Sequence, residues 1–287
     1  MGQLQTITRG LEPELGTAEF RAIVAIMQTD ARIHLSDAKS TLVHARLSRR
    51  LRDHRLTSFR DYLRLVDQDP AERAALVTAL TTNHTHFFRE KHHFDHLVAD
   101  VRPALRARGR TDPLRLWSAG CSTGEEVYTL AMCLLGTDGP DAAWLTTGEA
   151  DVRLLATDIA PPVVQATARG VYATATCDAI PRAYRDRWLR PVADGMEMAE
   201  VARRLVTARV LNLFGTWPMT HQFDVIFCRN VMIYFDDTAK AELEQRLVEQ
   251  LAPGGFLYIG HSERLTGAVA HVMTPCGQTI YRKAGSQ

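Results

Sequence analysis

From residue 17 to about residue 82, apolar residues recur every three or four positions, which is the spacing of one face of an α-helix. Phe20, Ile23 and Met27 belong to the first such stripe. Ser36 and Ser58 stand where N-caps would open a second and a third helix, and a fourth helix is expected over residues 71–80. The pattern predicts an N-terminal helical domain that spans residues 15–85.

Beyond residue 113, short apolar runs alternate with amphipathic stretches. Strands are expected at residues 114–117, 153–157, 223–228 and 255–260, with helices between them. Such alternation is typical of an α/β domain in which helices cover a mainly parallel sheet. Residues 278–283 would add an antiparallel edge strand. We therefore assign residues 114–284 to the α/β domain and residues 86–113 to a linker helix and connector.

The alternation breaks between residues 171 and 210. A short helix is expected over residues 181–190. Residues 196–199 and 203–210 have the pattern of short strands, and Asp194-Gly195 is a turn signal beside them. We interpret this stretch as a small inserted antiparallel β-subdomain, either a hairpin or a three-stranded sheet.

Residues 114–128 read LRLWSAGCSTGEEVY and carry the most specific chemistry. A strand runs into a turn with Gly120 and Gly124, and Glu125 and Glu126 then open a helix. Such a unit brings backbone N–H groups close to a ligand. A phosphate-binding loop would need Gly-Lys-Ser/Thr here, and a dinucleotide fold would need a third glycine. Because carboxylates repel phosphate and attract cations, the turn favours S-adenosylmethionine, which carries an amine and a positive charge.

Further candidates follow the ends of other expected strands, where ligands bind in open α/β sheets. A carboxylate at Asp158 could accept both ribose hydroxyls, or it could cap the next helix. Asn230 reaches the same edge, and Asn212 and Leu213 close another candidate strand and could flank an adenine. Tyr234 could line the pocket near a reacting methyl group, or it could be an ordinary packed aromatic residue.

Residues 81–90, TTNHTHFFRE, combine hydroxyls, an amide and an arginine around two phenylalanines. This composition suits a partly buried polar surface at a domain junction. Arg89 is the candidate for binding a carboxylate, and the alternative is an ordinary ion pair with Asp95 or with an acid of the α/β domain. His92 and His96 are four residues apart, but no cysteine or carboxylate completes a ligand set, so we expect no metal.

Composition sets limits on the class of protein. The chain has 46% apolar and 23% charged residues and a net charge of +1, which is ordinary for a globular protein. No apolar run approaches the about 18 residues of a membrane span, and no signal-peptide pattern is visible. Five cysteines without a C-x-x-C spacing favour reduced thiols. We expect a cytoplasmic protein without membrane insertion.

Positive charge is concentrated between residues 30 and 60, which contain eight Lys or Arg and three Asp. Arg46, Arg49 and Arg52 are spaced three apart, which places them in a row on the second helix. A solvated basic face is the plain interpretation. Nucleic-acid binding would favour aromatic residues interleaved with the arginines, and none stands between these three. An acidic helical protein surface is therefore the better candidate partner.

Five segments together resemble the CheR family of chemotaxis receptor methyltransferases. They are TTNHTHFFRE, WSAGCSTGEE, ATDI, FDVIFCRNVMIYF and PGGFLYIGHSE, and the resemblance covers about residues 15–283. It implies a class I, Rossmann-like S-adenosylmethionine methyltransferase domain, preceded by a helical domain and carrying an inserted β-subdomain. The implied activity is transfer of the cofactor's methyl group to glutamate side chains of bacterial chemoreceptors, with S-adenosylhomocysteine as the second product.

The resemblance also implies roles for individual residues. Cofactor contacts would fall on Asn83, Thr85, Arg89, Glu125 or Glu126, Asp158, Asn212, Leu213, Asn230 and Val231, and the catalytic pair on Arg89 and Tyr234. Arg46, Arg49 and Arg52 correspond to arginines that read the receptor's methylation helices. In some relatives the β-subdomain also binds a pentapeptide at the receptor's C-terminus. We expect a monomer that binds neither metal nor nucleic acid.

Two alternatives stay open. A methyltransferase acting on a small molecule or on nucleic acid would share the fold but would need a substrate pocket or phosphate-dependent binding. A non-catalytic adaptor would bind S-adenosylmethionine or its product as a signal. Arg89, Asp158, Asn230 and Tyr234 argue against the adaptor, because signal binding alone does not require a catalytic pair.

Overall fold

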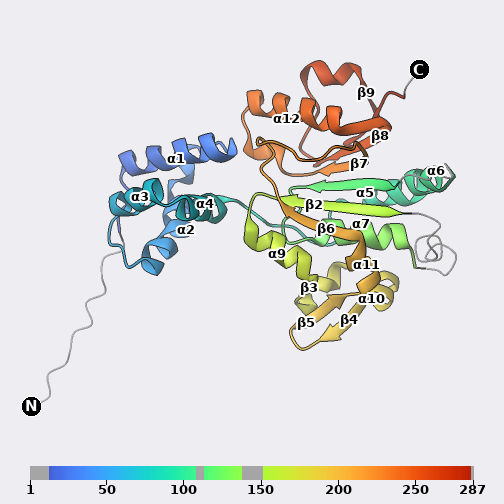
Figure 1. Cartoon of the computed structure of the whole chain (residues 1–287), viewed down its shortest axis with the longest axis horizontal. Helices are drawn as coiled ribbons and strands as arrows, with labels where there is room; N and C mark the ends of the chain where they lie inside the picture. Colours follow the sequence, from blue (N-terminus) through green and yellow to red (C-terminus); the bar gives the residue numbers. More distant parts are fainter. Residues whose placement is uncertain (1–12, 108–112, 138–150, 286–287) are drawn as a thin grey trace, which may run out of the picture. The chain divides into compact units, whose positions relative to one another are not determined.

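A computed structural model describes residues 13–107, 113–137 and 151–285. The chain divides into two compact units, Met1–Thr81 and Thr82–Gln287 (Figure 1). Each unit is described by itself below. Residues 108–112, which belong to the expected connector, lie outside the described part.

In the described part of the first unit, the helices are joined by short loops. It consists of α1 (Thr17–Ala31), the short 3₁₀ helix η1 (Asp37–Lys39), α2 (Ser40–Asp53), α3 (Phe59–Gln68) and α4 (Pro70–Leu80). Ser58 caps α3 as expected, because its hydroxyl accepts a hydrogen bond from the backbone N–H of Asp61. Ser36 instead precedes η1, so α2 begins three residues later than a cap at Ser36 predicts. The apolar stripes meet in one core, formed by Phe20, Ile23, Met27, Val43, Leu47, Leu51, Phe59, Tyr62, Val66 and Leu76.

The second unit is built on a seven-stranded sheet with the order β6-β2-β1-β7-β8-β10-β9. The first five strands run parallel, as predicted. They are β6 (Val206–Val210), β2 (Val152–Asp158), β1 (Leu114–Ala119), β7 (Phe223–Cys228) and β8 (Leu251–Ile259). Their carboxyl ends therefore meet at one edge of the sheet.

The last two strands correct one expectation. The final strand β10 (Ile280–Lys283) is antiparallel to β8, as predicted, but it is not an edge strand. It also pairs with β9 (Met273–Gly277), which forms the edge and which the sequence pattern did not reveal. Four of the five residues of β9 are exposed, so this strand lacks the apolar signal of a buried one.

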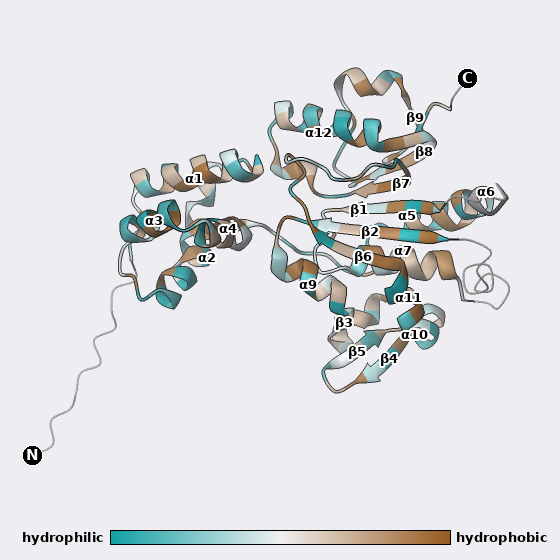
Figure 2. Cartoon of the chain, in the orientation of Figure 1, coloured by the Kyte–Doolittle hydropathy of each residue, from teal (hydrophilic) through white to brown (hydrophobic). Residues whose placement is uncertain are grey.

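Helices cover the sheet and complete the core. They are α5 (Lys91–His96), the π-helical turn η2 (Leu97–Val101), α6 (Arg102–Ala107), α7 (Glu125–Leu135), α9 (Pro161–Arg169) and α12 (Asp237–Gln250). Figure 2 shows α7 and the central strands mainly in apolar colours, whereas α12 alternates between polar and apolar positions. Within the second unit α9 packs on β2 and β6, and α12 packs on β8. None of these described helices is long and apolar enough to cross a bilayer.

A three-stranded antiparallel sheet with the order β3-β5-β4 interrupts the α/β pattern, as expected (Figure 1). Its elements are β3 (Val171–Tyr172), η3 (Thr174–Ala179), α10 (Arg182–Trp188), β4 (Leu189–Val192), β5 (Gly195–Met198) and α11 (Glu200–Leu205). The expected strand over residues 203–210 is half wrong. Residues 203–205 finish α11, and the remainder is β6, which pairs with β2 in the large sheet. The insertion therefore ends before Val206.

Candidate active site

The glycine turn after β1 is shaped by close packing. Gly120 has φ +83°, and a Cβ there would lie 2.5 Å from Val231. Gly124 has φ +97°, and a Cβ there would lie 2.8 Å from both Thr167 and Tyr172. Side chains at these two positions would be strained and would clash. The glycines thus let the turn approach α9 and the loop after β7, and Gly124 serves as the N-cap of α7.

Asp158 ends β2 and ties two loops together. Its Oδ2 accepts a 2.9 Å hydrogen bond from the N–H of Ser122 in the glycine turn, and its Oδ1 accepts one of 3.0 Å from Ala160. It does not cap α9, whose N-cap is Ala160, so the capping alternative is wrong. Burial raises the pKa of this carboxyl, although the backbone hydrogen bonds oppose the shift. Each oxygen retains a lone pair for a further donor.

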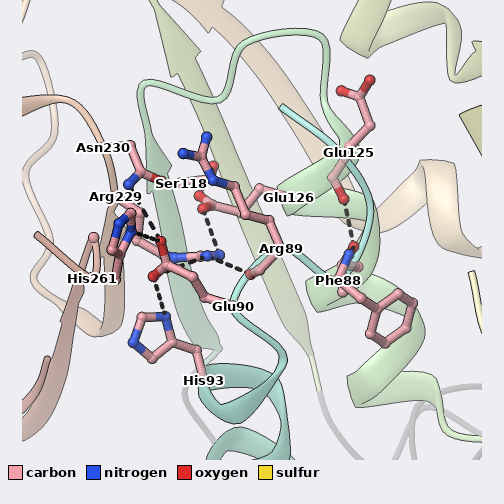
Figure 3. A network of polar contacts seen from close by, with 12 residues as sticks. Phe88, Arg89, Glu90, His93, Ser118, Glu125, Glu126, Arg229, Asn230 and His261 are labelled. Carbon is pink, nitrogen blue, oxygen red and sulfur yellow. Dashed lines mark hydrogen bonds and ion pairs between the residues drawn. The ribbon is translucent and has the colours of Figure 1, made fainter. Parts of the chain in front are cut away.

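Glu125 and Glu126 begin α7 but have different surroundings. The two oxygens of Glu126 accept hydrogen bonds from the hydroxyl of Ser118, at 2.7 Å, and from the guanidinium of Arg229, at 3.2 Å. Glu125 accepts a 2.6 Å hydrogen bond from the hydroxyl of Thr123. Figure 3 shows the Glu125 carboxylate directed away from Arg229. Burial raises the pKa of both carboxyl groups, so a cationic ligand would stabilise their ionised forms.

Arg229 is the central residue that sequence reasoning missed. Its side chain is 2% exposed and lies 3.2 Å from Glu126 and 3.4 Å from Glu90. Its Nη2 also donates to the backbone carbonyl of Arg89. We call these groups the Arg229 cluster: the side chains of Arg229, Glu90 and Glu126, and the carbonyl of Arg89 (Figure 3). An arginine directly after the six-residue buried strand β7 was the signal that could have revealed it.

Glu90 links the Arg229 cluster to the ends of β7 and β8. Its Oε1 accepts a 3.3 Å hydrogen bond from the side-chain amide of Asn230 and lies 3.0 Å from Nδ1 of His261. Burial alone would raise the pKa of Glu90, but the charge of Arg229 and the hydrogen bonds from His261 and Asn230 lower it to about 2. Glu90 is therefore ionised at neutral pH.

The loops after β7 and β8 are held by a second carboxylate. Glu263 is buried, and it accepts hydrogen bonds from the backbone N–H groups of Gly260, of Asn230, at 3.1 Å, and of Ile233, at 3.2 Å. Asn230 itself adopts φ +57°. The Glu263 carboxylate thus fixes the turn that places Asn230 at the carboxyl edge of the sheet.

The segment before α5 lies against the glycine turn. The carbonyl of Asn83 accepts a 2.7 Å hydrogen bond from the hydroxyl of Ser122, and Thr85 is half-buried. The half-buried Arg89 side chain donates a 3.2 Å hydrogen bond to the carbonyl of His84. The ion pair with Asp95 considered as an alternative is wrong, since Asp95 pairs with Lys91.

The remaining candidates also lie near the carboxyl ends of the strands. Asn212 and Leu213 come after β6, which ends at Val210, and Leu211 donates a 2.9 Å hydrogen bond to the carbonyl of Asp158. Val231 packs near the glycine turn. Tyr234 ends the 3₁₀ helix η4 (Met232–Tyr234) and is half-buried. The edge therefore brings Asp158, Glu125, Glu126, Asn230 and the segment before α5 together.

The basic row belongs to the first unit, and its members differ in accessibility. Nη1 of Arg46 donates hydrogen bonds of 2.9 Å to the carbonyl of Leu80 and 2.8 Å to that of Thr81, at the C-terminus of α4. Arg49 and Arg52 are exposed. The three arginines thus follow one side of α2, but the guanidinium of Arg46 is already hydrogen-bonded within its own domain.

The donor set at the sheet edge suits a cationic ligand. Buried carboxylates at Asp158, Glu125, Glu126 and Glu263 have pKa values raised by burial. A positive ligand lowers the free energy of such groups in their ionised form, whereas a phosphate would raise it. Among the described residues, no three His, Cys, Asp or Glu side chains are grouped as a metal site would require.

Two family models match almost the whole chain. The model described as CheR methyltransferase, all-alpha domain matches residues 18–81, and the model described as CheR methyltransferase, SAM binding domain matches residues 83–282. Among solved structures, the N-methyltransferase NodS from Bradyrhizobium japonicum is 17% identical, with a TM-score of 0.37 over 68% of this chain and 96% of that one. This distant likeness says nothing of function.

Relatives of known name are much more similar. A probable chemotaxis protein methyltransferase of Rhizobium etli is 41% identical over 265 residues, which cover 90% of this chain and 96% of that protein. Chemotaxis protein methyltransferase 2 of Pseudomonas aeruginosa is 41% identical over 88% of each chain. The chemotaxis protein methyltransferase of Escherichia coli K12 is 38% identical over 93% of this chain and 91% of that protein. The chain belongs to the CheR family of S-adenosylmethionine-dependent methyltransferases.

Proposed function

We propose that this methyltransferase transfers a methyl group from S-adenosylmethionine to glutamate side chains in the cytoplasmic helical region of bacterial chemoreceptors. The products would be glutamyl methyl esters and S-adenosylhomocysteine. The observation that carries the proposal is that both CheR domains match in order and that the acidic edge of the sheet lies beside Arg89. Receptor adaptation in chemotaxis would be the biological role, and the cytoplasm, which holds the receptor's helices, the location.

The chain's own residues would hold the cofactor at the sheet edge. S-adenosylmethionine supplies an electrophilic methyl group on a positively charged sulfur. Asp158 would accept hydrogen bonds from the ribose hydroxyls through its remaining lone pairs. Of the two glutamates of α7, we assign Glu125 to the cofactor's amino group, because the charge of Glu126 is already paired with Arg229, whereas Glu125 accepts a hydrogen bond from the neutral hydroxyl of Thr123. The other proposed contacts are Asn83, Thr85, Arg89, Asn212, Leu213, Asn230 and Val231.

The reaction needs positioning more than proton transfer. A glutamate side chain has a pKa of about 4.3, so the receptor's nucleophile is already ionised at neutral pH and needs no general base. Its carboxylate oxygen must be held about 3 Å from the methyl carbon and in line with the leaving sulfur. Arg89 and Tyr234 would provide this placement. Arg89 would act by electrostatic attraction, since a tight fork would occupy the lone pairs that must attack.

The receptor would be recognised through α2 and the β-subdomain. Arg49 and Arg52 are exposed and suit the acidic surface of a receptor helix. A pentapeptide at the receptor's C-terminus would dock on the small sheet β3-β5-β4. The enzyme would act as a monomer, which sedimentation analysis of the free protein would check.

The test is incubation with tritiated S-adenosylmethionine and cognate receptor cytoplasmic fragments. We expect base-labile label on receptor glutamates, and no label on fragments in which those glutamates are replaced by alanine. Arg89→Ala should abolish most of the labelling, whereas Arg153→Ala, at an exposed pair with Asp151, should not. Base-stable label, or unchanged labelling by Arg89→Ala, would contradict the proposal. Fragments without the C-terminal pentapeptide would test the tether separately.

A further inference from the structure

The Arg229 side chain is buried at the sheet edge, where it contacts carboxylates and aromatic rings from several elements. A buried guanidinium costs free energy unless its charge is paired and its donors are satisfied. Arg229 meets Glu126 from α7 at 3.2 Å and Glu90, before α5, at 3.4 Å. Its charged carbon also lies 5.4 Å and 5.9 Å from the ring centres of Phe94 and Phe227. One side chain therefore connects α7, the segment before α5 and the end of β7.

The backbone around Arg89 adopts a costly conformation. Phe88 has φ +56° and Glu90 has φ +57°, so Arg89 stands between two left-handed residues that carry side chains. Non-glycine residues avoid this region unless surrounding contacts enforce it, and such strain is concentrated at functional sites. The direction of the Arg89 side chain depends on these two neighbours.

The contacts that hold this conformation come from α7 and from Arg229. The N–H of Phe88 donates a 3.2 Å hydrogen bond to the hydroxyl of Thr129 in α7. The carbonyl of Arg89 accepts from Nη2 of Arg229, and the same guanidinium pairs with the carboxylate of Glu90. Arg229 thus binds both Arg89 and one of its left-handed neighbours, as Figure 3 shows.

We propose that Arg229 is a positioning residue, which through the Arg89 carbonyl and the Glu90 carboxylate holds the backbone that aims the Arg89 side chain at the reacting carboxylate. The inference rests on the proposed function, in which Arg89 acts at the reacting centre. Arg229 itself would touch neither cofactor nor substrate.

Replacement by lysine separates charge from geometry. Arg229→Lys keeps the positive charge, but a single ammonium cannot reach Glu126, Glu90 and the Arg89 carbonyl with the geometry of a planar fork. We expect kcat for receptor methylation to fall about 10- to 100-fold, because small misplacements of a positioning group have effects of that size. The affinity for S-adenosylhomocysteine, measured by calorimetry, should fall by a smaller factor than kcat, because Asp158 and Glu125 still bind the cofactor.

A double-mutant cycle gives the decisive readout. If Arg229 acts through Arg89, Arg229→Lys should lower kcat in the wild-type background but not further in an Arg89→Ala background. A merely structural role would make the two losses multiply, and that result would overturn the inference. If Arg229→Lys does not fold, the same cycle is run with Glu90→Gln. This variant keeps the hydrogen bonds to Asn230 and His261 but removes the charge that Arg229 binds.

Hydrogen exchange tests the backbone claim without cofactor or substrate. Arg229→Lys should speed amide exchange at Phe88 and Arg89 and leave α4 in the first unit unchanged. Arg73→Lys is the matched control, since the guanidinium of Arg73 donates two hydrogen bonds, of 2.6 and 2.9 Å, to the carboxylate of Asp30 in that unit. It should alter neither kcat nor exchange at residues 88–90. Unchanged exchange at Phe88 and Arg89 in Arg229→Lys would also overturn the inference. Failure of the wild-type enzyme to label receptors would instead refute the proposed function.

Discussion

The carboxylate of Asp158 accepts a 2.9 Å hydrogen bond from the backbone N–H of Ser122. The bond joins the end of β2 to the glycine turn that follows β1. A residue expected to bind the cofactor's ribose or to cap the next helix instead shapes the loop on the neighbouring strand, whether or not it also binds the ribose. Substitution of Asp158 should affect the shape of the pocket as well as the contact with the ligand.

We predict that Asp158→Asn weakens binding of S-adenosylhomocysteine by about tenfold or more. The carboxylate accepts N–H donors on both oxygens, from Ser122 and Ala160. An asparagine amide would present its NH₂ group to one of these donors, so one hydrogen bond must be lost. Calorimetric titration measures the affinity. Asp69→Asn is the matched control, because Asp69 accepts a single backbone N–H at the start of α4. Equal affinities of wild type and Asp158→Asn would contradict the prediction.

Gly124→Ala should both destabilise the protein and reduce cofactor binding. An alanine whose backbone is held in the left-handed region lowers the free energy of unfolding by about 1–2 kcal/mol. The added Cβ would also lie 2.8 Å from Thr167 and Tyr172, and such overpacking costs about 1–3 kcal/mol. Denaturant unfolding followed by tryptophan fluorescence would measure the loss, since all four tryptophans belong to the second unit.

Gly254→Ala is the comparison that isolates the clash. Gly254 also has positive φ, at +73°, but the nearest atom to its Cβ would be 3.9 Å away. Its substitution should therefore cost only the conformational term of about 1–2 kcal/mol and leave cofactor affinity unchanged. If the two alanine variants were equally stable, packing around Gly124 would not be what requires a glycine there.

The sequence predicted those features that depend on short-range pattern. The strand ends at Asp158 and Asn230 follow apolar runs, and parallel strands bring their carboxyl ends to one edge. The glycine turn could be predicted in the same way, since Gly120 and Gly124 stand between a strand pattern and a helix pattern. Local signals of this kind were sufficient to predict the parallel sheet and the inserted antiparallel sheet.

Features that depend on long-range contacts were not predictable. Glu90 and Arg229 are far apart in sequence, and no local pattern at either position predicts that the two side chains form an ion pair. The hydrogen bonds of Arg46 to Leu80 and Thr81 likewise require the packing of α2 against α4. Strand β9 was missed because its exposed residues carry no apolar pattern. In each case the deciding interaction is tertiary, and the local sequence is compatible with other outcomes.

Stability of the second unit should fall as the pH drops below about 6.5, in part because of His93. Burial, with the charges of Arg229 and His92, lowers the pKa of this imidazole from 6.5 to about 3. Between these values the unfolded chain binds a proton that the folded chain does not. The contribution of His93 is therefore complete above pH 6.5 and is lost as pH falls towards 3, by at most about 1.4 kcal/mol per pH unit.

The His93→Phe variant tests this slope. It should lower stability at pH 7.5, because the 2.9 Å contact between Nε2 and the hydroxyl of Thr279 is lost. Its stability should nevertheless depend less on pH between 6.5 and 5 than that of the wild type. Tryptophan-monitored unfolding at three pH values gives the comparison. An imidazole resonance of His93 that titrates near pH 6.5 in the folded protein would disprove the explanation.

Arg46 and Arg49 stand three residues apart on α2, but their substitutions should affect different properties. We expect a change at Arg46 to affect stability and a change at Arg49 to affect receptor recognition. Arg46→Ala removes two hydrogen bonds to the main chain at the end of α4, so it should destabilise the first unit by about 1–3 kcal/mol. Arg49→Glu changes an exposed side chain, so it should leave the unfolding free energy nearly unchanged. It should reduce receptor methylation several-fold through charge repulsion, most strongly at low salt, without changing S-adenosylhomocysteine affinity. Circular dichroism of the helices and labelling of receptor fragments measure the two effects. If Arg49→Glu labelled receptors like the wild type, α2 would not be the surface that binds them.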